Sequence, residues 1–220
     1  MQALSSPPVA RAFAAFLLVI SAAHNARADE PEGTQRTSRR NALQLGFGLG
    51  GETVASAGNV CPDDAAAPCI LRSGGGVTIR SGYRYASPWY FGGAYEFSRH
   101  DSSSVLRLAI LQQLRGEMRY YVDYGQRATP FLAAGLGAHL YGSDWAASTG
   151  GPLATLGGGI EFELSPTTVV GAAASYRMLF PRGWTDEAGQ RRADGLFGFG
   201  LAHLLGLELI LEIRDPVPHW

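Results

Sequence analysis

The sequence predicts an all-β protein, an eight-stranded antiparallel up-and-down transmembrane β-barrel. First, eight segments alternate between apolar and polar residues with a period of two, which indicates strands with two different faces. Second, the breaks between them carry Pro, Gly, Asp and Ser, and the regular recurrence of these turn residues is typical of an antiparallel meander. Third, all 18 basic residues are Arg, whereas a soluble domain usually covers its surface with Lys and Glu. The composition therefore indicates that only a small part of the protein surface is in contact with water.

The N-terminus has the features of an export signal. Arg11 precedes an apolar run at residues 12–23, and the motif ARA at 26–28 stands ahead of the acidic stretch DEPE. This order is typical of a secretory signal peptide, and the run is too short to span a bilayer. The predicted organisation is a signal peptide at 1–28, a polar N-terminal tail at 29–41, the barrel at 42–214 and a C-terminal tail at 215–220.

The composition excludes several classes of protein. The formal net charge is -1, so no global field attracts nucleic acid, and we expect no nucleic-acid partner. Charged residues make up 17% of the chain, below the roughly 25% of soluble domains, while Gly reaches 29 residues. After residue 28 there is no uninterrupted apolar run of about 20 residues. Transmembrane helices are therefore excluded, but transmembrane strands are not.

The first two predicted strands, 43–54 and 71–85, flank the motif CPDDAAAPC. In an exported protein this close pair, Cys61 and Cys69, predicts a local disulfide. Closing so short a loop removes roughly 2 to 3 kcal/mol of unfolded-state entropy in the chain model. A metal site is the alternative, although it would have only two thiols and no nearby His.

The third and fourth predicted strands, 89–100 and 105–122, show the alternation most clearly. In the third, aromatic residues occupy one parity, and small or polar residues, Glu96 among them, occupy the other. The fourth could be read as an amphipathic helix, but a helical wheel mixes Arg107 and Arg115 with Leu106 and Ile110. With a period of two, the charged and apolar residues separate onto opposite faces, so the segment is predicted to be a strand.

The last four predicted strands are 131–141, 153–164, 168–180 and 196–214, separated by the breaks GSDWAASTGGP, LSPTT and FPRGWTDEAGQRRADG. They too have one apolar face and one face of glycine with mixed charge. Small residues with a few Arg and Glu suit the narrow lumen of an eight-stranded barrel, where opposite charges pair, so the apolar face is predicted to meet lipid. We expect a lumen charge network made of Arg72, Arg80, Arg84, Glu96, Arg107, Arg115, Glu117, Arg119, Glu161, Glu163, Arg177 and Glu208.

Aromatic residues gather towards the ends of the predicted strands, which is typical of the two interfacial girdles of a membrane barrel. They are Tyr83, Tyr85, Trp89, Tyr90, Tyr120, Tyr121, Tyr141, Phe180 and Trp184.

The stretches YYVDYGQRATPFLAAGLGAHLYG and GGGIEFELSPTTVVGAAASYRM resemble the strand–turn–strand units of small bacterial outer-membrane barrels of the OmpA/OmpX type. The resemblance implies a Gram-negative outer membrane reached through the periplasm, with both termini, the 29–41 tail included, on the periplasmic side. It places the cysteine loop and PRGWTDEAGQRRADG outside. It also implies recognition by the barrel-assembly machinery, often through a final aromatic residue. Here Pro216 and Pro218 interrupt any strand that reaches Trp220.

The sequence favours a structural or surface-interaction role without catalysis, cofactor or metal, because the histidines form no ligand or catalytic motif. Outer-membrane lipid, including lipopolysaccharide, is the expected partner, and a monomer the expected state. The loop with Trp184 and Arg191 is a possible contact for lipopolysaccharide phosphate. Three alternatives stay open: a lipid A-modifying acyl hydrolase, with His203 on the lipid face; a narrow pore; and a soluble ligand-binding barrel.

Overall fold

The computed structural model describes residues 40–61, 68–103, 105–122, 128–186, 189 and 191–217. The predicted signal peptide, nearly all of the predicted N-terminal tail, and Trp220 lie outside the described residues. None of the helices in the described part is long and apolar enough to cross a membrane.

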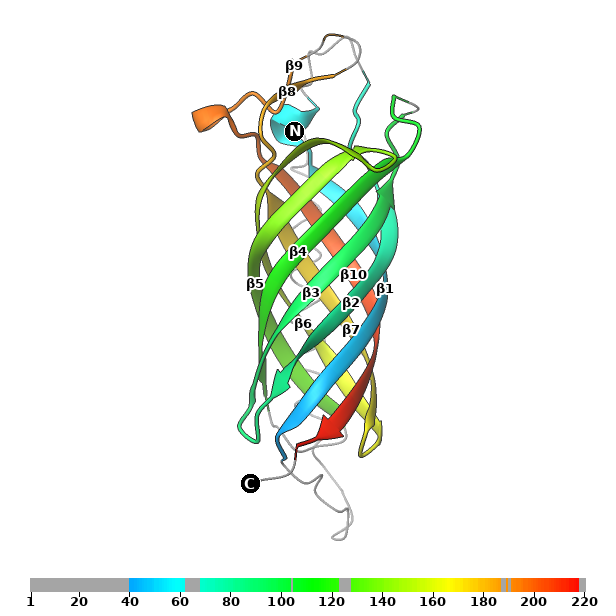
Figure 1. Cartoon of the computed structure of the whole chain (residues 1–220), viewed down its shortest axis with the longest axis vertical. Coiled ribbons are helices and arrows are strands. Elements are labelled where there is room, and N and C mark those ends of the chain that lie inside the picture. Colours follow the sequence, from blue (N-terminus) through cyan, green and yellow to red (C-terminus); the bar gives the residue numbers. More distant parts are fainter. Residues whose placement is uncertain are drawn as a thin grey trace, which may run out of the picture. The chain divides into compact units, whose positions relative to one another are not determined.

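Eight strands close into an antiparallel barrel, which confirms the predicted fold class (Figure 1). Around the barrel the order is β1-β10-β7-β6-β5-β4-β3-β2, so each strand pairs with its chain neighbour and β10 closes against β1. The strands are β1 Ala42–Ser56, β2 Gly74–Arg84, β3 Trp89–His100, β4 Ala109–Tyr121, β5 Ala128–Ser143, β6 Ala146–Ser165, β7 Thr168–Leu179 and β10 Ala202–Pro216.

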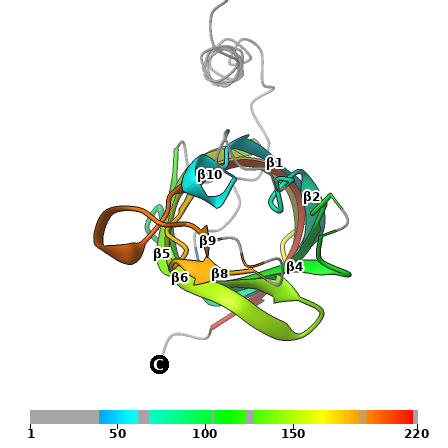
Figure 2. The same cartoon turned by 90° about the horizontal axis from the view of Figure 1, so that it is seen from above.

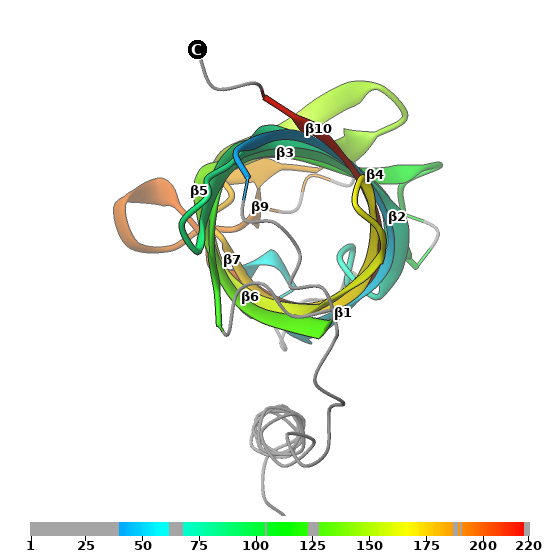
Figure 3. The ribbon, with the colours of Figure 1, turned by 90° about the horizontal axis from the view of Figure 1, so that it is seen from below.

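The two ends of the barrel differ. The start of β1 and the end of β10 lie at one end, together with the short turns at 85–88 and 166–167 (Figures 1 and 3). The other end carries longer connections at 57–73 and 180–201. These connections contain the one-turn helices η1 Gly58–Val60 and η2 Leu196–Gly198, and the small hairpin of β8 Trp184–Thr185 and β9 Arg191–Arg192. We call these two ends the turn end and the loop end.

Side chains alternate between an exposed apolar outside and a buried polar inside. In β1, Leu43, Leu45, Phe47 and Leu49 are each about half exposed or more, whereas Gln44 is buried. The same alternation covers the outside of the barrel with a belt of exposed Leu, Ile and Phe. Inward glycines make room for long side chains that cross the lumen. A Cβ on Gly48 would lie only 1.7 Å from a carboxylate oxygen of Glu208.

Several predicted strand ends were wrong. Strand β4 begins at Ala109 rather than at 105, because Ser102 holds a local turn: its Oγ donates to the Leu106 oxygen and accepts the Leu106 amide. The predicted long break GSDWAASTGGP is mostly strand, since β5 and β6 continue to a tight turn at residues 144–145. Strand β10 begins at Ala202 rather than at 196, because η2 precedes it.

The predicted girdle holds only in part. At the turn end, Trp89 and Tyr120 are exposed with their ring centroids 4.9 Å apart, and Tyr85 lies 4.8 Å from Tyr83. However, Tyr90, Tyr121 and Tyr141 point inward and are buried. They share the parity of the charged residues, so position at a strand end did not decide the direction of these rings.

Candidate functional site

The lumen is the most distinctive part of the molecule. Within the described residues, six Arg and six Glu form ion pairs with one another inside the barrel. They are Arg80 and Arg84 of β2, Arg115 and Arg119 of β4, Arg177 of β7 and Arg214 of β10, with Glu52 of β1, Glu96 of β3, Glu117 of β4, Glu161 of β6, and Glu208 and Glu212 of β10. We call these twelve residues the lumen network.

At the turn end, the lumen network centres on Glu161. Its carboxylate lies 2.8 Å from Arg84 Nη1 and 2.5 Å from Arg214 Nη2, and it accepts a 2.7 Å hydrogen bond from the Tyr121 hydroxyl. The Arg84 guanidinium stacks 3.6 Å from the Tyr121 ring centroid. This one acid thus ties β6 to β2, β4 and β10.

Two residues further from the turn end than Tyr121, Arg119 is 1% exposed in its side chain and contacts three acids. Its Nε donates to Glu117 at 2.6 Å, and its Nη1 lies 2.8 Å from Glu212 and 3.2 Å from Glu161. Glu212 also accepts a 2.5 Å hydrogen bond from Gln44 of β1. Arg119 therefore joins β4 to β6 and to β10, the strand that closes the barrel.

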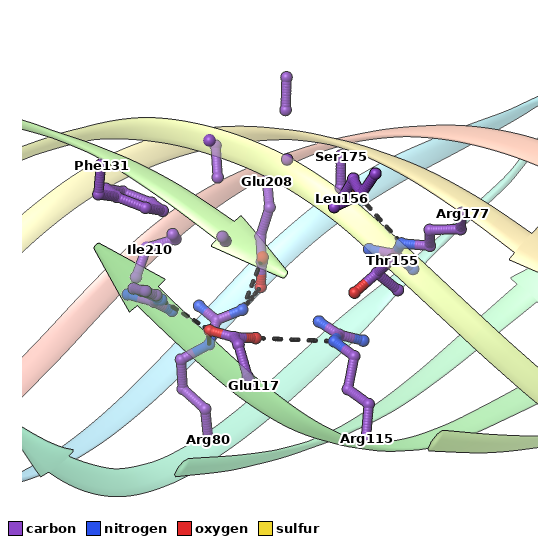
Figure 4. A pocket seen from close by; sticks show the side chains of 16 residues that line it. Arg80, Arg115, Glu117, Phe131, Thr155, Leu156, Ser175, Arg177, Glu208 and Ile210 are labelled. Atoms are coloured by element: carbon purple, nitrogen blue, oxygen red, sulfur yellow. Dashed lines mark hydrogen bonds and ion pairs between the residues drawn. The ribbon is translucent and has the colours of Figure 1, made fainter. Parts of the chain in front are cut away.

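One layer nearer the loop end, Arg80 reaches Glu208 with Nη2 at 2.7 Å and 2.9 Å from the two oxygens (Figure 4). Arg115 Nε lies 3.6 Å from Glu117, and its Nη1 lies 2.9 Å from Glu96. A cavity of about 40 Å³ lies among Arg80, Arg115, Glu117 and Glu208. It has room for about three waters, taking 10 to 15 Å³ for each.

The last layer of the lumen network contains Arg177, which donates to Glu96 at 2.5 Å and also to Glu52. His100 links this layer to the loops. Its Nε2 lies 2.9 Å from Glu52 Oε2, and its Nδ1 lies 2.8 Å from the backbone oxygen of Arg72. All of these groups are buried, so the pairs lie in a medium where an unpaired charge is costly.

Above the lumen network, apolar side chains fill the loop-end mouth. Residues of the 57–73 connection fold into it, with Ile70 and Leu71 nearly fully buried against Leu204. Tyr141 of β5 donates its hydroxyl to the Ile70 oxygen. We call this cluster the apolar cap; its buried members are Val60, Ile70, Leu71, Ala109, Leu111, Tyr141, Leu153, Leu179, Ala193, Ala202 and Leu204.

Two further bonds hold the loops at this mouth. The predicted disulfide between Cys61 and Cys69 is present and closes the 57–73 connection on itself. The β8–β9 hairpin lies at the same end of the barrel (Figure 2), where Arg192 Nε pairs with Asp186 at 2.9 Å, and both side chains are buried. The loop that was predicted as a lipopolysaccharide contact thus uses one of its arginines internally.

The structure brings together nine of the predicted network residues in the lumen: Arg80, Arg84, Glu96, Arg115, Glu117, Arg119, Glu161, Arg177 and Glu208. The prediction was wrong for Arg107, which is 82% exposed and pairs with Asp144 at 3.3 Å. It was also wrong for Arg72, which is exposed because Ile70 and Leu71 occupy the mouth at that height. Glu163 is half-buried near the turn end, without an ion pair to any described residue.

The predicted charge network left out several polar residues that line the lumen: Gln44, Glu52, His100, Gln113, Glu212 and Arg214. Each lies on the inward parity of its strand, so the same period of two that identified the strands could have found them.

The outer face carries a hydrogen-bonded pair of polar side chains where β7 and β10 approach the loop end. His203 of β10 accepts or donates a 2.5 Å hydrogen bond at Nδ1 with the Tyr176 hydroxyl, and the two rings stack. Ser56 of β1 stands opposite His203 in the strand register. This juxtaposition could not be predicted from the alternation of residues, because a β-bulge after Val54 shifts the register there.

The comparisons with known proteins identify the fold only. No family model and no curated protein matches the sequence. The crystal structure of Neisserial surface protein A (NspA) matches with a TM-score of 0.52 and 14% identity, over 80% of this chain and 97% of that one. The solid-state NMR structure of outer membrane protein AlkL in DMPC lipid bilayers matches with a TM-score of 0.51 and 12% identity, over 88% and 99%. The chain therefore has the fold of the small outer-membrane β-barrels, the OmpA/OmpX-like class.

Proposed function

We propose that this chain is a monomeric bacterial outer-membrane protein with a structural or surface-interaction role, a plugged lumen and no catalytic activity. The observation that carries the proposal is the lumen network, in which six arginines and six glutamates pair across the inside of the barrel. The formal charges of these twelve residues sum to zero. The network is thus neutral overall and has no excess charge that would attract ions of one sign into the lumen.

Lipid is the partner of the outer surface. Leu136, Leu207 and Leu209 are each about 70% exposed, and they belong to a belt that surrounds the barrel. Soluble monomers rarely expose contiguous apolar patches of more than a few hundred Å². Transmembrane strands, in contrast, need this outward alternation over about 9 to 11 residues. We infer that the belt spans the outer membrane after assembly by the barrel-assembly machinery, with lipopolysaccharide at the loop end.

The plug has two parts that act in series. Conduction through the lumen network would require several buried ion pairs to break, and each broken pair leaves an uncompensated charge in a low dielectric medium. Beyond the network, the aliphatic side chains of Ile70 and Leu71 in the apolar cap offer a hydrated ion nothing polar to bind. The 40 Å³ cavity lies within the lumen network and holds only a few waters.

Membrane fractionation and planar-bilayer recording test the proposal together. We expect the protein in the outer-membrane fraction, with a heat-dependent shift of the unboiled band on SDS gels. We expect no steady unitary current from the purified chain. A protein that stays soluble without detergent would refute the membrane assignment. Steady unitary currents would refute the plug and favour the narrow pore.

A lipid A hydrolase is the second candidate, favoured by the pairing of Ser56 with His203 on the outer face. Acyl transfer to a serine needs a histidine base oriented by a third group, a role that Tyr176 could take here through its bond to Nδ1. Among the described residues no carboxylate pairs with His203. Mass analysis of lipid A with and without the gene separates this candidate from the first: a lost acyl chain that Ser56→Ala restores would establish it.

A further inference from the structure

An open cavity of about 440 Å³ lies at the loop end where β3 passes into β4. Its wall contains Arg99 at the end of β3, and Arg107 in the connection, together with Asp101 and Leu106. This volume falls within the usual range of small-molecule sites, roughly 300 to 1,000 Å³, so it is large enough for a sugar ring with an attached phosphate. None of the twelve residues of the lumen network lines it, and it borders the apolar cap at Ala109.

The charges of this cavity favour an anion. Arg99 is exposed, and no described carboxylate pairs with it. Arg107 is 82% exposed, and its only ion pair within the described residues is the 3.3 Å contact with Asp144. One carboxylate oxygen of Asp101, Oδ1, already accepts a hydrogen bond from the backbone amide of Ser103. Two guanidinium groups thus line the same cavity. The planar guanidinium group of Arg can donate two parallel hydrogen bonds to a phosphate, which makes Arg the side chain best suited to bind one.

The surface next to the cavity favours an amphiphile over a free anion. Two residues before Arg99, on the same outward face of β3, Phe97 packs against Trp145 with ring centroids 5.6 Å apart. One step further along this face, the Tyr95 hydroxyl donates a 2.8 Å hydrogen bond to Gln112. The apolar belt begins there, with Leu114 opposite Tyr95. The site therefore changes from cationic to aromatic to aliphatic along one strand pair.

We propose that Arg99 and Arg107 bind a phosphate group on the sugar head of lipopolysaccharide, whose acyl chains then run along the outward face of β3 and β4 past Phe97. The proposal rests on the outer-membrane location proposed above. It assigns a site to that partner at a place different from the 181–195 loop in which the sequence placed it.

Native mass spectrometry of the full chain in detergent tests the assignment. Lipid A that carries both phosphates is titrated against the wild type and against the variants Arg99→Gln, Arg107→Gln and the double variant. Arg182→Gln is the matched control, because this arginine is also exposed at the loop end but does not line the cavity. The unboiled gel shift verifies that each variant is folded.

We expect about a tenfold weaker affinity for each single variant, which corresponds to the loss of one charge-assisted hydrogen bond, and no change for Arg182→Gln. Lipid A without phosphates should bind the wild type as weakly as the double variant binds the intact lipid. Equal affinity of the folded double variant and the wild type would overturn the proposal, and so would equal binding of the dephosphorylated lipid. Competition by millimolar inorganic phosphate alone would assign the site to a free anion and also overturn it. The outer-membrane location is tested separately by membrane fractionation, so a negative result there can be distinguished from a negative result in the lipid titration.

Discussion

Replacing Arg119 by Met tests whether the lumen network stabilises the barrel. The variant Arg119→Met keeps a long side chain in the space but removes the guanidinium that contacts Glu117, Glu161 and Glu212. The three acids differ in how many ion-pair partners they keep after the substitution. This difference determines how much unfolding free energy the variant should lose.

Two of the acids keep other cations. Glu117 still has Arg115 at 3.6 Å, and Glu161 still has Arg84 at 2.8 Å. Glu212 has no other ion pair among the described residues and keeps only the amide of Gln44. Its side chain is 0% exposed, so the variant leaves one buried carboxylate uncompensated. Breaking a buried pair in this way costs about 3 to 5 kcal/mol of unfolding free energy.

The assay is equilibrium unfolding of the full chain in lipid vesicles with guanidinium, followed by tryptophan fluorescence and by the unboiled gel shift. A double variant, Arg119→Met with Glu212→Leu, removes both charges and should recover stability to within about 1 to 2 kcal/mol of the wild type. Arg191→Met is the control, because Arg191 forms a 3.1 Å ion pair with Asp194 that is largely exposed. Its loss should cost less than about 1 kcal/mol.

Two results would refute the reasoning. One is a loss below about 1 kcal/mol for Arg119→Met, which would show that water or a neighbouring group already compensates Glu212. The other is additivity, in which the double variant is as unstable as the sum of the singles, because the coupling between Arg119 and Glu212 would then be absent.

Three further predictions address the outside and the loops. Leu209→Arg, at the middle of the belt, should lower the unfolding free energy by about 2 to 4 kcal/mol in lipid vesicles relative to Leu209→Ala, and equal stabilities would argue against a lipid-facing belt. Cys61→Ser should lower it by about 2 to 3 kcal/mol without changing the barrel's far-ultraviolet dichroism; no change in the unfolding midpoint would mean that the disulfide does not constrain the unfolded chain. The segment that contains η2, drawn in orange, lies outside the barrel wall (Figure 2), and Phe197 of η2 is 90% exposed. A spin label at Phe197→Cys should therefore meet oxygen more than a water-soluble nickel chelate. A label at Thr185→Cys should show the reverse, and identical accessibility would exclude lipid contact of η2.

The fold could be predicted from the sequence because a membrane barrel repeats one rule on every strand. The period of two assigned the inward direction of Arg115, Glu117 and Arg119 correctly, since nothing in the middle of a strand competes with the ladder. The same rule failed for Arg107, where Ser102 captures the backbone into a turn before the strand begins. Local hydrogen bonds of this kind depend on where a neighbouring strand stops, which no single segment reveals.

Which Arg pairs with which Glu in the lumen network could not be predicted from the sequence either. Parity shows that Glu52 and Arg177 face inward. Their contact, however, depends on the relative offset of β1 and β7, and the two residues are 125 positions apart in the sequence. The apolar cap was missed for a related reason: Leu71 was expected to begin a strand, yet it fills, together with Ile70, the mouth that the closed barrel creates. Such contacts exist only once the ring has formed.

The seam between β1 and β10 shows what the ion pairs add to the apolar alternation. Both strands present leucine after leucine to the outside, so sliding one past the other by two residues would still place Leu against lipid, with little change in burial. The same slide would carry Glu212 roughly 7 Å from Gln44 and displace Glu208 from Arg80 by a similar distance. Hydrophobicity selects which face each strand turns outward, and the buried charges select the stagger at which the ring closes. The lumen network thus determines the register between the strands, and with it the shear of the barrel.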